Sequence, residues 1–122
     1  MTRIDATFEI TRWDAETYDA PADGPPSTRA VVAKRYAGAL AGESLAELLT
    51  SGELAYLANE RVTGTLDGRG GTFVLQHGAW EGGQWGFVVP GSGTGALAGL
   101  RGEARLEHGK IALDYELESA SA

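Results

Sequence analysis

The chain has 122 residues, a hydrophobic fraction of 43%, a charged fraction of 22% and a net charge of −7. This length and composition exclude wholesale disorder and support one core, so we expect a single domain over residues 1–122. The acidic excess disfavours nucleic acid as a partner, because it repels phosphate backbones, and the absence of cysteine excludes disulfides and zinc–thiolate sites.

The first predicted element is a strand over residues 3–13, where apolar and polar residues alternate. Its apolar face consists of Ile4, Ala6, Phe8 and Ile10. Residues 14–27 contain Pro21, Gly24, Pro25 and Pro26, which do not fit a central strand, so we expect a long loop there. Such a loop is either a functional lid or a solvated connection.

Glycines divide the rest of the chain into short segments, a spacing typical of sandwiches and barrels. The best helical candidate, residues 43–49, is barely two turns long and lies between strand-like segments, so we predict a strand there as well. The predicted strands after the first are 29–36, 40–49, 54–66, 71–80, 84–89, 97–107 and 110–118.

A two-residue turn at His108-Gly109 predicts the register of the last hairpin. The apolar pairs in this register are Leu106 with Ile111, Ala104 with Leu113, Gly102 with Tyr115 and Leu100 with Leu117. The opposite face sets Glu103 against Asp114, a repulsion that Arg105 would have to screen.

A second hairpin turns within residues 67–71, and a tip at Arg69-Gly70 places Val62 opposite His77 and Glu60 opposite Ala79. The next strand, 84–89, is apolar on both faces. A three-residue turn before it would point Trp85 and Phe87 inward, whereas a two-residue turn would point them outward, into a subunit contact.

About eight strands can close on themselves, so the predicted fold is all-β, a single antiparallel β-barrel. Side chains fill such an interior or leave space for one small ligand. The small residues predicted to face inward, Ala58, Gly64, Gly102 and Ala104, favour some space.

The glycine-rich segment 90–95 is not followed by a Walker lysine or a helix, so we do not expect a phosphate site. The two histidines, His77 and His108, are predicted to lie apart. We therefore expect no metal site and no cofactor.

Glu60 and His77 are predicted to be diagonal neighbours on the inward face, near Tyr56. A carboxylate beside an imidazole in a dry cavity suits proton transfer, and Tyr56 or Tyr115 would donate a hydrogen bond to developing charge. The catalytic candidates are therefore Glu60, His77 and Tyr115. The alternative is a buried polar pair that satisfies itself and has no catalytic role.

Aromatic and aliphatic side chains predicted to face the interior would wall a pocket for an apolar ligand. The predicted ligand-binding residues are Tyr56, Phe73, Leu75, Trp85, Phe87 and Leu113. The alternative is that they belong to the core or to a subunit interface.

Three motifs together carry a family resemblance: ERVTGTL at residues 60–66, TFVLQH at 72–77 and VVPGSGTG at 88–95. With them the chain resembles the DUF3224 family of small bacterial proteins. The resemblance implies an allene oxide cyclase-like, calycin-type β-barrel. More distantly, the end of the chain looks like that of allene oxide cyclases and dirigent proteins, which steer reactive hydrophobic intermediates inside a barrel.

Three functions remain open. The barrel is an isomerase or cyclase acting on a small hydrophobic molecule, a noncatalytic binding protein for such a molecule, or a scaffold that associates into a homodimer or homotrimer. The chain has no apolar run typical of a signal peptide or a membrane span, so we expect no membrane partner and a cytoplasmic protein.

Overall fold

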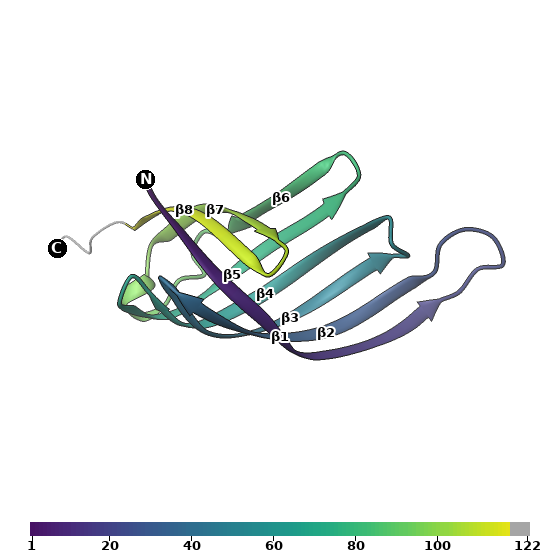
Figure 1. Ribbon diagram of the computed structural model, residues 1–122, viewed down its shortest axis with the longest axis horizontal. Helices are drawn as coiled ribbons and strands as arrows, with labels where there is room; N and C mark the ends of the chain where they lie inside the picture. The colour runs from purple at the N-terminus through teal and green to yellow at the C-terminus, as the bar shows by residue number, and fades with distance from the viewer. Residues whose placement is uncertain (118–122) are drawn as a thin grey trace.

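Eight antiparallel strands form a closed barrel in the computed structural model, which describes residues 1–117 and confirms the predicted all-β fold. Each strand pairs with the next along the chain, and β8 pairs back with β1 (Figure 1). The elements are β1 (Thr2–Asp19), β2 (Ser27–Gly38), β3 (Leu40–Ser51), β4 (Ala55–Leu66), β5 (Arg69–Trp80), β6 (Gly83–Val88), η1 (Gly95–Leu97), β7 (Leu100–Glu107) and β8 (Lys110–Leu117).

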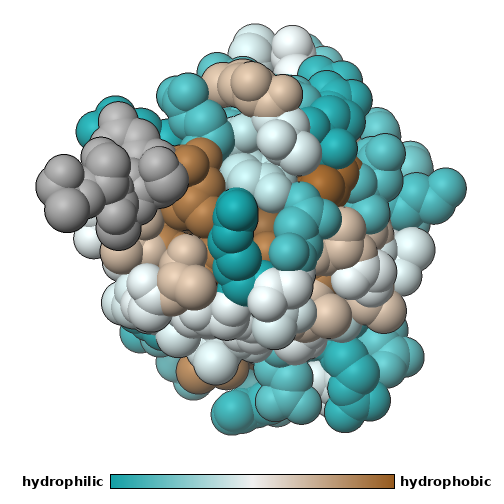
Figure 2. Space-filling view, turned by 90° about the vertical axis from the view of Figure 1, so that its left-hand side faces the viewer, coloured by the Kyte–Doolittle hydropathy of each residue, from teal (hydrophilic) through white to brown (hydrophobic). Residues whose placement is uncertain are grey.

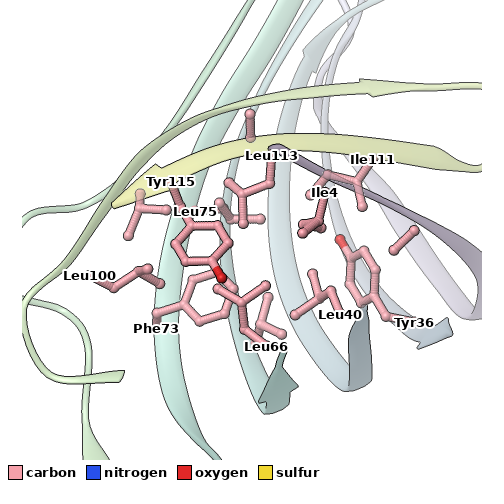
Figure 3. Packing of buried hydrophobic residues seen from close by; sticks show 14 of the residues in the cluster. Ile4, Tyr36, Leu40, Leu66, Phe73, Leu75, Leu100, Ile111, Leu113 and Tyr115 are labelled. Atoms are coloured by element: carbon pink, nitrogen blue, oxygen red, sulfur yellow. The ribbon is translucent and has the colours of Figure 1, made fainter. Parts of the chain in front are cut away.

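The main core fills the part of the barrel that β7 and β8 help to enclose. Buried side chains alternate with outward ones along β2, β4 and β8, as a period of two requires. Figure 3 shows Tyr115, Phe73 and Leu66 packed at one side of this core and Tyr36 and Leu40 at the other. The end of the barrel near the chain termini is covered mainly by hydrophilic and neutral residues, with hydrophobic surface near its centre and at the lower edge of the view (Figure 2).

The β7–β8 hairpin has the predicted register, with Leu106 opposite Ile111. His108 adopts a positive φ of 51° and Gly109 one of 75°, as a tight two-residue turn demands. Asp114 does lie opposite Glu103, but its partner is Arg3 of β1, which donates two hydrogen bonds of 2.6 and 2.7 Å. Closure of the barrel therefore brings Arg3, and not Arg105 of the hairpin, onto Asp114.

The predicted register of the β4–β5 hairpin was wrong. The turn is Asp67-Gly68, with positive φ values of 49° and 82°, and not Arg69-Gly70. Asp-Gly suits this turn because both residues tolerate the left-handed region. Glu60 consequently lies opposite Leu75, four residues from the predicted partner. Because four is even, every side chain keeps its predicted face.

The first hairpin is longer than predicted, because residues 14–19 continue β1 and pair with the start of β2. Only residues 20–26, which contain the prolines, form the loop. An extra residue at Thr11 makes a β-bulge between Ile10 and Arg12. The bulge places both Ile10 and Trp13 on the concave face, although their sequence spacing is odd.

The turn between β5 and β6 has two residues, because Trp80 pairs with Gly83. Trp85 and Phe87 therefore point outward, where they stack with ring centroids 6.1 Å apart.

The predicted strand 97–107 begins only at Leu100, since residues 95–97 form the 3-10 helix and bury Leu97. The predicted strand end at residue 118 lies outside the described residues.

The strands differ in reach, which leaves one end of the barrel open. The hairpins of β1–β2, β3–β4 and β5–β6 extend beyond the short β7–β8 hairpin (Figure 1).

Between β3 and β4, Gly42 and Gly64 pair at very close range, since a Cβ on Gly64 would lie 2.0 Å from the carbonyl oxygen of Ala41. Only glycine permits this approach.

Candidate functional site

A group of buried polar side chains crosses the barrel at the border between the apolar core and the open end. We call it the Glu60 cluster; it consists of Lys34, Tyr36, Ser44, Glu60 and His77. Glu60 is completely buried at the centre of β4. Each of the other members donates a hydrogen bond to its carboxylate, so a buried charge is fully coordinated.

The four donors divide evenly between the two carboxylate oxygens. Oε1 accepts from Lys34 Nζ at 3.0 Å and from His77 Nε2 at 2.8 Å. Oε2 accepts from the hydroxyls of Tyr36 and Ser44, both at 2.6 Å. Among residues 1–117, no buried side-chain nitrogen or oxygen lacks a partner. The carboxylate thus has no free lone pair for a substrate proton.

The alternation of β2 explains how a lysine reaches this position. Ala30, Val32, Lys34 and Tyr36 all point inward, and the ammonium group of Lys34 lies 4.4 Å from the centre of the Phe8 ring. The aromatic face and the Glu60 carboxylate together compensate the buried positive charge.

These contacts set the charge state of Glu60. Burial raises the pKa of a carboxyl group, but the hydrogen bond from His77, the charge of Lys34 and the two hydroxyl donors outweigh it and lower the pKa to about 2. Glu60 is therefore a fixed anion at neutral pH, and it is unsuited to the acid or base role that the sequence suggested.

His77 connects the buried carboxylate to a more accessible phenol. Its Nε2 faces Glu60, and its Nδ1 lies 3.0 Å from the hydroxyl of Tyr56, which is half-buried. A carboxylate only accepts hydrogen bonds, so Nε2 carries the proton, and in the neutral ring Nδ1 accepts from Tyr56. Burial, followed by the charge of Glu60, raises the pKa of Tyr56, so its hydroxyl stays protonated.

Above the cluster lies a cavity of about 210 Å³. Its apolar walls are Phe8, Ile10, Trp13, Val32, Leu48 and Leu106. Lys34, Tyr56 and His77 give it a polar floor, while Glu107 and His108 contribute from the β7–β8 turn. The cavity is therefore lined by three polar side chains that are linked to Glu60 by hydrogen bonds. Lys34 and His77 bond to Glu60 directly, and Tyr56 is linked to it through His77.

Other hollows are larger but differ in lining. One of about 740 Å³ shares Tyr56 with the cavity and extends between the β3–β4 and β5–β6 turns. Another, of about 900 Å³, is lined by β1, β2, β7 and β8 and contains no member of the Glu60 cluster. We therefore take the smaller cavity as the candidate site, because polar side chains that converge on a cavity indicate a binding site better than its volume does.

The model of a family described as "protein of unknown function (DUF3224)" matches residues 4–118. The chain belongs to the DUF3224 family. A crystal structure of a DUF3224 protein with unknown function from Shewanella oneidensis MR-1 is 31% identical in sequence, with a TM-score of 0.83. The match covers 98% of this chain and 99% of that one. The search of curated proteins gave no match.

Within this DUF3224 barrel, the predicted catalytic residues do not form one site. Glu60 and His77 meet on the inward face, but Tyr115 lies in the main core and donates its hydrogen bond to Asp67. Tyr115 is held there because β8 places it opposite Gly102 and Thr2, far along the strand from the open end. Its assignment to the site was therefore wrong.

The predicted ligand-binding residues also separate. Tyr56 lines the cavity. Phe73, Leu75 and Leu113 are buried in the main core and leave no surface for a ligand. Trp85 and Phe87 lie on the outer face because the preceding turn is short. The cavity walls come instead from β1, β2, β3 and β7.

Sequence reasoning missed Lys34, Tyr36 and Ser44 as partners of Glu60. The sequence does contain a signal, since Lys34 stands among small and apolar residues at every second position of its strand. An inward lysine in such a strand needs a buried anion. The two histidines were expected apart, yet both line the cavity.

In the described part of the chain, no three His, Asp or Glu side chains gather so as to hold a metal ion. Across residues 1–117, no helix has the length and hydrophobicity needed to cross a membrane.

Proposed function

We propose that the chain binds a small, mainly apolar molecule whose polar end faces Lys34, Tyr56 and His77. The observation that carries this proposal is the cavity of about 210 Å³ with apolar walls and a floor of buried donors and acceptors. Apolar walls supply affinity through the hydrophobic effect, whereas a few placed polar groups fix orientation.

The size of the cavity limits the ligand. Pockets that enclose drug-sized molecules typically measure about 300–1,000 Å³. A cavity of about 210 Å³ therefore accepts a compact molecule, or one end of a longer molecule that continues past Tyr56 into the neighbouring hollow.

The sheet order supports the finer fold assignment that the sequence suggested. Eight strands joined in an up-and-down order are typical of barrels that hold one small ligand, and a calycin-type, allene oxide cyclase-like barrel accords with this order. Neither activity nor substrate of those proteins is carried over to this chain.

The test begins with native mass spectrometry of protein purified from its own host, which would reveal a copurified small molecule. Binding is then measured by isothermal titration calorimetry. Leu48→Trp fills the cavity and is expected to abolish binding. Its matched control is Leu57→Trp, because Leu57 is half exposed on the outer face of β4. Equal binding by both variants would refute the proposed site.

Two other functions have observations in their favour. The chain of contacts from Tyr56 through His77 to Glu60 favours an isomerase or cyclase over passive binding. The exposed Trp80, Trp85 and Phe87 on the outer face of β5 and β6 favour self-association into a homodimer or homotrimer. Light scattering of the wild type and of Trp85→Lys separates this scaffold function from ligand binding.

A further inference from the structure

We infer that the cavity takes a small enolisable ketone or aldehyde, that Tyr56 donates a hydrogen bond to its carbonyl oxygen, and that His77 removes a proton from the neighbouring carbon. This inference rests on the proposed function, because the substrate would occupy the same cavity. It also replaces the role that the sequence suggested for Glu60, which becomes a positioning residue.

The orientation of His77 provides the base. Glu60 accepts a hydrogen bond from the protonated Nε2, which leaves the lone pair of Nδ1 directed toward Tyr56 at the cavity. When Nδ1 takes a proton, the resulting imidazolium remains 2.8 Å from the Glu60 carboxylate, whose negative charge stabilises it. Glu60 therefore acts through His77, by holding its tautomer and by compensating its charge.

The oxygen of the substrate meets two donors. Tyr56 is a protonated phenol at the cavity wall, and it can exchange its bond to Nδ1 for one to a carbonyl oxygen. Lys34 has three N–H groups, of which one bonds Glu60 at 3.0 Å, and the residue also lines the cavity. An ammonium beside an enolate oxygen stabilises the charge that develops there.

The proposed step balances in atoms and charge. The C–H bond beside the carbonyl breaks, its proton moves to Nδ1, and the electron pair forms the enolate. The site then holds two positive charges, on Lys34 and on the His77 imidazolium, and two negative charges, on Glu60 and on the enolate. The transfer therefore does not change the net charge of the site. If solvent deuterium replaces the proton on Nδ1, return of the deuteron to the same carbon gives isotope exchange, and return to the far carbon of a conjugated enolate moves a double bond. No oxidant or further reactant is needed.

The test is hydrogen–deuterium exchange, in which proton NMR follows the loss of α-hydrogen signal from cyclohexanone and acetophenone in D₂O. We expect the wild type to accelerate exchange over buffer. We expect His77→Gln to lose roughly 100-fold or more of the acceleration, as for removal of a general base. Tyr56→Phe removes one donor to the developing enolate oxygen and is expected to lose about 100-fold. Tyr115→Phe, in the main core, serves as the control and should retain the full rate.

Binding of the same ketones, measured by isothermal titration calorimetry, separates this inference from the proposed function. If the ketones bind and exchange does not exceed buffer, the proton-transfer role is wrong and the binding function stands. If neither ketone binds nor exchanges while another class of molecule binds, the substrate class is wrong. If His77→Gln exchanges as fast as wild type, His77 is not the base.

The positioning role of Glu60 has its own readout. Nitrogen-15 NMR of His77 should show a protonated Nε2 and an unprotonated Nδ1 in the resting wild type. Glu60→Gln by itself would leave Lys34 buried without a counter-ion. The same NMR measurement is therefore made on the double variant Lys34→Met, Glu60→Gln, in which we expect the tautomer of His77 to be no longer fixed. A mixed or reversed tautomer in the wild type would contradict the proposed role.

Discussion

Replacing Glu60 with glutamine tests whether the buried charge network holds the barrel together. The substitution keeps the size of the side chain but removes the anion from a site where Lys34 is only 6% exposed. Loss of one partner of a buried ion pair typically costs about 3–5 kcal/mol, because the other charge stays buried alone. A typical domain is stable by only about 5–15 kcal/mol, so this is a large fraction.

Urea unfolding at pH 7, followed by tryptophan fluorescence, measures this loss. With an m-value of about 2 kcal/mol per molar, a cost of about 4 kcal/mol lowers the midpoint by about 2 M. The double variant Lys34→Met, Glu60→Gln removes both charges, so we expect it to recover most of the loss. A single variant within about 1 kcal/mol of wild type would refute the reasoning, since Lys34 would then not depend on Glu60.

Three further predictions concern stability. The pKa of Glu60 is about 2 in the folded protein against an ordinary 4.5, so its ionisation contributes roughly 3 kcal/mol to the free energy of unfolding above pH 4.5. This contribution is lost as the pH falls toward 2. Unfolding titrations from pH 7 to 2 should therefore show a shallower loss of stability in Glu60→Gln than in the wild type. Tyr115→Phe loses the hydrogen bond to Asp67 and should cost about 1 kcal/mol in urea unfolding without changing ligand affinity. Gly64→Ala would force a Cβ against the carbonyl of Ala41 and should cost about 3 kcal/mol or more, so an unchanged melting temperature would contradict the close strand approach.

Local patterns were sufficient for the number of strands and for the direction of many side chains, although not for where β1 ends or β7 begins. Alternation places Glu60 and His77 on one face even though the predicted β4–β5 register was wrong, because the error was an even number of residues. The odd-spaced Ile10 and Trp13 show the limit of this rule. Their common face depends on the bulge at Thr11, which forms only when β2 pairs with β1.

The tight turns show why local chemistry is informative but incomplete. His108-Gly109 was recognised, and the whole β7–β8 register followed from it. Asp67-Gly68 suits a two-residue turn as well as His108-Gly109 does. The two glycines that follow, Gly70 and Gly71, made a tip at Arg69-Gly70 just as plausible from the sequence. Pairing along the full length of β4 and β5 decides between such tips, because every cross-strand contact contributes.

The sequence by itself determined that this chain is an all-β barrel and that a carboxylate and an imidazole face its interior, since these conclusions depend on a period of two, on turn residues and on the number of strands. Tertiary structure alone decided what those groups do. Closure of the sheet brought Lys34, Tyr36 and Ser44 onto Glu60, and this made it a fixed anion. The unequal reach of the hairpins opened one end of the barrel above His77 and Tyr56, and neither effect exists until distant strands meet.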